Sequence, residues 1–117
     1  MIEQLISKVF AARNAAHLAH WATGSYAEHV ALGDFYEKAI DLIDDFIESY
    51  QGAFGKIGKF ELNKEKSQDI IAMLAEQAQW MNENSEALCN DISATENLLD
   101  NLIDLYLKTS YKLKELK

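Results

Sequence analysis

Apolar residues recur at steps of three and four positions through most of this chain, and no proline interrupts them. This spacing matches the 3.6 residues per turn of an α-helix and places the apolar side chains along one helix face. Proline inside a helix removes a backbone hydrogen bond and clashes with the preceding turn, so its absence favours long, uninterrupted helices. The pattern therefore predicts an all-α fold.

Four segments carry this pattern, and each is predicted to be one helix: 1–22, 26–51, about 64–82 and about 93–116. A three-residue break separates the first two segments, and so short a connection predicts that these helices pack antiparallel. No strand pattern occurs elsewhere. The sequence predicts an antiparallel up-down four-helix bundle that forms a single domain over residues 1–117.

Three further signals place the helix boundaries. The glycine-containing stretch 52–63 is predicted to end the second helix and to form a connector. Ser93, followed by Glu96, makes a capping box and predicts that the last helix starts at residue 93. Residues 83–92 fit either a loop or a helix continued from one side, since the apolar repeat runs on through them.

Composition argues against several classes of function. The chain has a formal net charge of −8, whereas binding to a phosphate backbone needs cations grouped on one face, so nucleic acid is not an expected partner. No apolar run approaches the roughly 20 residues of a membrane span, and the N-terminal residues do not resemble a signal peptide. We expect a cytoplasmic protein. The single cysteine, Cys89, is interpreted as a small packing residue.

One stretch holds the only side chains whose types and spacing indicate metal chemistry. It contains all the histidines of the chain and an acid pair at i,i+4 spacing: His17, His20, His29, Asp44 and Glu48. Imidazole and carboxylate groups in this combination suit iron, and also zinc or manganese. No Ser-His-Asp or Cys-His arrangement accompanies them, so no residue is assigned a catalytic role.

The position of these residues on the second predicted helix determines how they could meet. Both acids point away from its apolar arc, and Asp44 lies roughly 22 Å from His29 along the helix axis, so one copy cannot bring them to a single ion. Two copies that pair this helix antiparallel about a two-fold axis would set His29 of one chain opposite Asp44 and Glu48 of the other. His17 or His20 would complete each site. The sequence therefore predicts a homo-oligomer built through this helix.

The same stretch resembles a known family. The residues that carry the resemblance are His20-Trp21, Tyr26, His29 and Asp44-x-x-x-Glu48. They look like the central signature of the Dps-type branch of the ferritin-like superfamily, and among its members the chain is most similar to small, uncharacterised Dps-like proteins of phages. The resemblance implies a ferritin-like fold, a di-iron ferroxidase site between two-fold-related subunits, iron oxidation by peroxide or oxygen, and a shell-like assembly.

The chain differs from the family pattern at two places. Gly33 stands where the family has an aspartate, four residues after the histidine of the second helix. His17 keeps the family spacing to His29, whereas His20 carries the adjacent tryptophan, so either histidine is a candidate ligand.

An alternative function belongs to another class. A non-enzymatic helical-bundle protein could keep the dimer and lack metal chemistry. Tyr26 and Val30, which lie outside the main apolar arc of the second helix, fit a contact surface under either hypothesis. Iron uptake by the purified protein separates the two.

Overall fold

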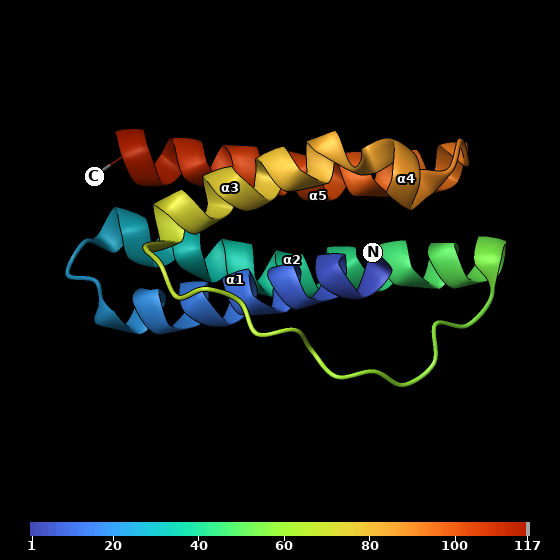
Figure 1. The fold of residues 1–117 in the computed structure, drawn as a ribbon. Coiled ribbons are helices and arrows are strands. Elements are labelled where there is room, and N and C mark those ends of the chain that lie inside the picture. The colour runs from blue at the N-terminus through green and yellow to red at the C-terminus, as the bar shows by residue number, and fades with distance from the viewer. Residues whose placement is uncertain (117) are drawn as a thin grey trace.

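The structure, a computed structural model, describes residues 1–116, and all of its regular secondary structure in that range is helical, with no strand. Its helices are α1 (Ile2–Ala22), α2 (Tyr26–Phe54), α3 (Ile70–Glu83), α4 (Ser85–Cys89) and α5 (Ser93–Glu115), as labelled in Figure 1. The prediction of an all-α fold is confirmed. None of these helices combines the length and the apolar character that crossing a membrane requires.

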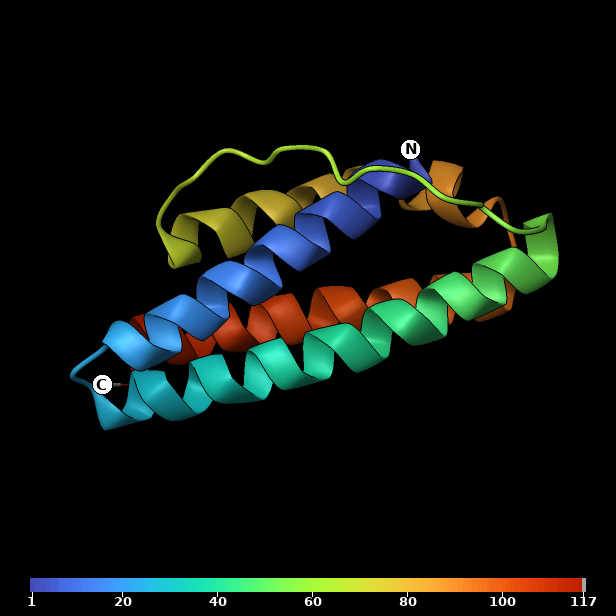
Figure 2. The same ribbon diagram turned by 90° about the horizontal axis from the view of Figure 1, so that it is seen from below.

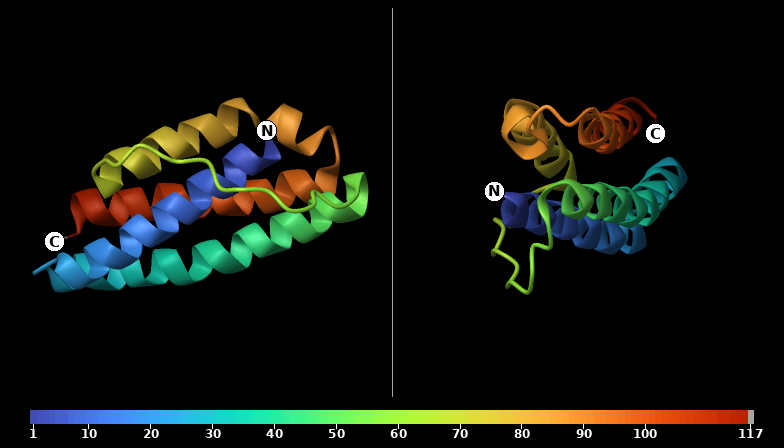
Figure 3. Two further views of the ribbon diagram at one scale, coloured as in Figure 1. Left: turned by 60° about the horizontal axis from the view of Figure 1, so that its bottom comes forward. Right: turned by 90° about the vertical axis from the view of Figure 1, so that its right-hand side faces the viewer.

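The long helices pack side by side into an elongated helical bundle of 44 × 27 × 21 Å. Helix α1 contacts α2 and α3, and α5 contacts the same two helices, so α1 and α5 stand at opposite corners of the bundle. The end-on view in Figure 3 shows the α1–α2 pair beside the pair formed by α5 and α3 with α4. The short helix α4 continues the line of α3 toward the start of α5.

Helices α2 and α3 run in the same direction, and the predicted strict up-and-down order is wrong at this one connection. Residues 55–69 return along the length of the bundle instead of turning tightly (Figures 1 and 2). An extended segment of this length reaches about 50 Å, enough to follow the 44 Å long axis. Helices that contact one another are still antiparallel, because α2 and α3 stand at opposite corners.

The start of α2, the end of α2 and the start of α3 agree with the sequence signals to different degrees. Ser25 caps α2, since its hydroxyl accepts the backbone N–H of Glu28 at 3.3 Å. Helix α2 continues past the predicted end at residue 51 to Phe54, and Gly55 ends it with a φ of 94°. Helix α3 begins at Ile70 and not near residue 64, because the carboxylate of the preceding Asp69 accepts the first free backbone N–H groups of the helix.

Helix α5 begins at residue 93 as predicted, but the predicted capping box is wrong. The N-cap residue is Ile92, and no side chain caps this end of the helix. The hydroxyl of Thr95 instead donates to the carbonyl oxygens of Ile92 at 2.7 Å and of Cys89 at 3.2 Å. Asn90, with a φ of 46°, ends α4 and separates it from α5. Residues 83–92, which the sequence left open between loop and helix, therefore contain both: the short helix α4 and the loop that follows it.

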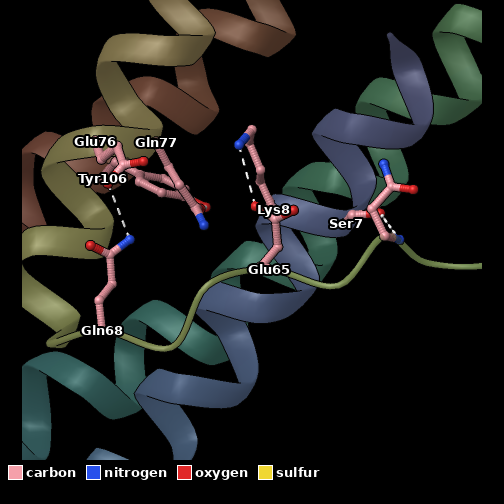
Figure 4. Close-up of polar contacts among 8 residues, drawn as sticks. Ser7, Lys8, Glu65, Gln68, Glu76, Gln77 and Tyr106 are labelled. Atoms are coloured by element: carbon pink, nitrogen blue, oxygen red, sulfur yellow. Dashed lines mark hydrogen bonds and ion pairs between the residues drawn. The ribbon is translucent and has the colours of Figure 1, made fainter.

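The core is the predicted set of apolar faces together with the buried polar side chains of Ser7, Gln77, Thr95 and Thr109. The largest fully buried side chains include Tyr106, Phe35, Phe46, Leu5, Ile43 and Leu74. A serine outside the apolar repeat of the first helix would ordinarily face solvent, yet Ser7 is only 2% exposed. The connector covers it, and its hydroxyl accepts the backbone N–H of Asn63 at 2.8 Å (Figure 4). Leu116 continues the apolar spacing of the last helix, yet it lies just past the end of α5 and is exposed.

Candidate functional site

His20 of α1 and His29 of α2 face each other where the two helices meet. Their rings are stacked, with centroids 3.7 Å apart and planes inclined by 19°. The Nδ1 atom of His20 lies 2.6 Å from the carbonyl oxygen of His29, and the Nδ1 atom of His29 lies 3.0 Å from the carbonyl oxygen of His20. A carbonyl oxygen only accepts, so each Nδ1 carries the proton that it donates.

The exchange of hydrogen bonds has a local structural reason. The carbonyl of His20 belongs to the last turn of α1, where helical carbonyls have no partner within the helix. The imidazole of His29 supplies the missing donor. The two side chains therefore join the end of the first helix to the first turns of the second.

His17 lies one turn before His20 and contacts aromatic side chains, one of which, Tyr36, also meets the ring of His20 edge-on at 5.3 Å between centroids. The ring of His17 stacks on that of Tyr36, with centroids 3.9 Å apart, and its centroid lies 4.4 Å from that of Trp21. The guanidinium of Arg13 covers the same tyrosine at 5.4 Å. The ring of His17 is 6.4 Å from that of His20, so all the histidines gather at one end of the α1–α2 hairpin. The apolar spacing of the second helix includes Tyr36, but it does not reveal this stacking.

Gly33 lies directly beside the histidine pair. A Cβ atom added to it would stand 3.1 Å from Cε1 and 3.3 Å from Nδ1 of His20. Such contacts are tighter than ordinary van der Waals packing. The ring of His20 therefore occupies the space next to the backbone of α2 that a side chain at position 33 would need.

The two acids stand apart from the histidines within one chain. Asp44 and Glu48 are both exposed on α2, which is continuous, so roughly 22 Å along the helix axis separates His29 from Asp44. Across residues 1–116, no cluster of three or more histidine, cysteine, aspartate or glutamate side chains is arranged to hold a metal ion. The structure brings the histidines together and leaves the carboxylates elsewhere. The predicted meeting of both groups between two copies stays a prediction.

Large apolar side chains are exposed around the histidines. Leu18, Trp21, Tyr26 and Val30 are 63%, 68%, 81% and 42% exposed. Tyr26 and Val30 were expected on a contact surface, and both are exposed as that expectation requires. Leu18 was missed because it falls outside the apolar repeat of the first helix, a position that usually carries a polar residue.

The outer face of α2 combines this apolar area with the acids. At about 100° per residue, Tyr26, Val30, Asp44 and Glu48 fall on one face of the helix. All four are exposed. One surface stripe is therefore apolar near the start of α2 and acidic toward its end.

The chemistry available to the histidine pair follows from its hydrogen bonds. In the neutral form of each ring, Nδ1 holds the proton and Nε2 keeps a lone pair. Histidines that bind metals are commonly oriented by such a bond from the other ring nitrogen to a backbone carbonyl. His20 and His29 can thus offer oriented nitrogen ligands, whereas Asp44 and Glu48 could join them only from another copy.

Comparison with known proteins places the chain in a family but supplies no activity. The model of a family of unknown function, DUF5856, matches residues 20–113. The match includes His20, His29 and both acids, and it begins after His17. No curated protein and no solved structure gives a significant match.

Proposed function

The chain belongs to the family of unknown function DUF5856, and from the geometry of its histidine pair we propose that it is a ferritin-like, Dps-like subunit. It self-associates through α2 and binds iron between subunits. The observation that carries the proposal is the pair of reciprocal hydrogen bonds between His20 and His29. These bonds orient both rings and leave the lone pair of each Nε2 atom available to a metal ion.

In the proposed site, one subunit provides the imidazoles and its mate provides the carboxylates. His29, with His20 or His17, binds ferrous ion from one side, and Asp44 and Glu48 of the second copy complete the ligand set. The substrate is ferrous iron, and oxygen or peroxide takes the electrons. Zinc and manganese accept the same ligand types and are tested beside iron.

Two observations outside the histidine pair support this proposal. The chain order, with one long connection that joins two parallel helices, is compatible with ferritin-like bundles, which have one such crossover. The outer stripe of α2 also exposes apolar and acidic side chains together, as an interface that completes a metal site requires.

A second function is favoured by the exposed apolar area around Trp21 and Tyr26. A helical-bundle interaction protein without metal chemistry would use the same surface. Within the part of the chain that the structure describes, no three or more histidine, cysteine, aspartate or glutamate side chains are grouped to hold a metal ion, which is compatible with this function.

The first experiment measures the molar mass of the purified protein by light scattering at micromolar concentration. The proposal expects a dimer or a larger closed assembly. A stable monomer would remove the shared site and with it both the iron hypothesis and the α2 interface.

The second experiment is an anaerobic ferrous titration followed by addition of oxygen or peroxide, with absorbance reporting the ferric product. We expect the wild type to oxidise iron and the double variant His29→Ala, Glu48→Ala to lose uptake. Glu96→Ala is the matched control, because Glu96 is an exposed acid on a different helix. Equal uptake by all three proteins contradicts the iron proposal and leaves the interaction protein.

A further inference from the structure

The position of the His20 ring against α2 depends on Gly33, a residue of α2 that lies beside it. Glycine inside a helix is unfavourable because it loses more backbone freedom on folding than any other residue. Gly33 and Gly52 both lie inside α2. Nothing lies within 4 Å of a Cβ atom added at Gly52, whereas at Gly33 the new atom meets the ring of His20 at 3.1 Å. The two glycines therefore differ in what a methyl group would contact.

The ring of His20 has little freedom to move aside. One face stacks on His29 at 3.7 Å, and its Nδ1 atom is held 2.6 Å from the carbonyl oxygen of the same residue. Both that carbonyl and Gly33 belong to α2. A methyl group at position 33 pushes the ring away from this helix, and the same displacement lengthens the hydrogen bond.

We infer that Gly33 is a positioning residue for the metal site: its missing side chain lets His20 bind the backbone of α2 through Nδ1 and present Nε2 to a divalent transition metal ion. This inference rests on the proposed function. It assigns a role to Gly33, and it selects His20, beside which Gly33 lies, as the ligand from α1.

The test uses cobaltous ion as the probe, added without oxygen and followed by its absorbance. We expect Gly33→Ala to weaken cobalt binding by about 10- to 100-fold, the usual cost of disturbing a group that orients a metal ligand. Gly52→Ala, the matched control in the same helix, should bind cobalt like the wild type. Circular dichroism checks that each variant is folded.

The role of His20 is tested by making the Gly33→Ala substitution in a variant that lacks the His20 ring. In a His20→Ala background there is nothing for the new methyl group to displace, so Gly33→Ala should cause no further loss of cobalt affinity. This comparison also serves if the single variant unfolds, because the double variant has room for the methyl group. An equal loss in both backgrounds would mean that Gly33 acts on the fold and not through His20, and would overturn the inference.

Two outcomes separate this inference from the proposed function. If the wild type binds no cobalt, iron, zinc or manganese, the proposed metal site itself fails. If the wild type binds cobalt and Gly33→Ala binds it equally well, only the positioning role fails. Nitrogen-15 NMR of the imidazoles gives an independent readout, since the inference expects the Nδ1-protonated form of His20 in the wild type and a mixture of tautomers in Gly33→Ala.

Discussion

Among single residues, Tyr106 carries a fully buried ionisable group. Its side chain is 0% exposed, its hydroxyl donates to Oε1 of Gln77 at 2.7 Å, and its ring meets the ring of Phe35 edge-on. Burial raises the pKa of Tyr106 well above the ordinary value of 10.0. The tyrosine therefore keeps its proton in the folded protein at any pH at which the chain is ordinarily handled.

This burial predicts how stability changes in alkali. Above pH 10.0 the tyrosine of the unfolded chain ionises while the folded one does not, so the unfolded state binds fewer protons and stability falls as pH rises. The slope from this residue is about 1.4 kcal/mol per pH unit. We expect Tyr106→Phe to remove it, at a cost of about 1 kcal/mol at neutral pH for the lost hydrogen bond. Urea unfolding at about pH 7, 9 and 11 measures both effects.

The matched control is Tyr111→Phe, since Tyr111 is 58% exposed and its surroundings change less on unfolding. That variant should keep the alkaline slope of the wild type. A slope that is the same in the wild type and in Tyr106→Phe would contradict the prediction.

At the scale of elements, two helices begin with polar residues that look alike in sequence and behave differently. The carboxylate of Asp69 accepts the backbone N–H groups of Ile71 at 3.1 Å and Ala72 at 3.3 Å. Ser93 makes no such bond, because it is the first residue of α5 and Ile92 occupies the N-cap position. Capping depends on the register of the first turn, which a sequence motif does not specify.

This difference predicts unequal effects of alanine. Asp69→Ala should lower the free energy of unfolding by about 0.5–2 kcal/mol, the usual cost of losing an N-cap. Ser93→Ala should change it by less than about 0.5 kcal/mol, as expected of a surface position. Urea denaturation of the two variants and the wild type checks this. If Ser93→Ala lowered the free energy of unfolding more than Asp69→Ala does, this prediction would be wrong and Ser93 would be the capping residue.

At the scale of the whole molecule, the connector joins elements that are distant in sequence. The ammonium group of Lys8 lies 3.3 Å from the carboxylate of Glu65 and 5.1 Å from the ring centroid of Trp80 (Figure 4 shows the ion pair). Both members of the ion pair are about four-fifths buried. Lys8 of α1 thus contacts both the connector and α3. These contacts help to fix the path of the connector and with it the direction of α3.

We expect Lys8→Ala to loosen the connector. The substitution removes both contacts of the ammonium group, so the free energy of unfolding should fall by about 1 kcal/mol and trypsin should cleave faster after Lys64 or Lys66. Lys108→Ala is the control, because the pair of Lys108 with Asp104 is exposed and lies within one helix. Its loss should cost only about 0.3–0.5 kcal/mol and leave cleavage unchanged. Equal cleavage rates in the two variants would mean that Lys8 does not hold the connector.

The apolar repeat alone determined the number of long helices, their buried faces and the tight turn between the first two, because local periodicity decides which side of a helix avoids water. It also placed the histidines at one end of the first hairpin and set the acids far along α2. These features depend on residues that are close in sequence.

The direction of α3 and the seat of His20 were decided only by tertiary structure. The path of residues 55–69 depends on contacts between Ser7 and Asn63 and between Lys8 and Glu65, pairs that no local pattern connects. The stacking of His20 on His29 depends on how closely α1 approaches Gly33. A helical repeat specifies which face is buried, whereas the partner of that face and the distance between them come from packing of the whole chain.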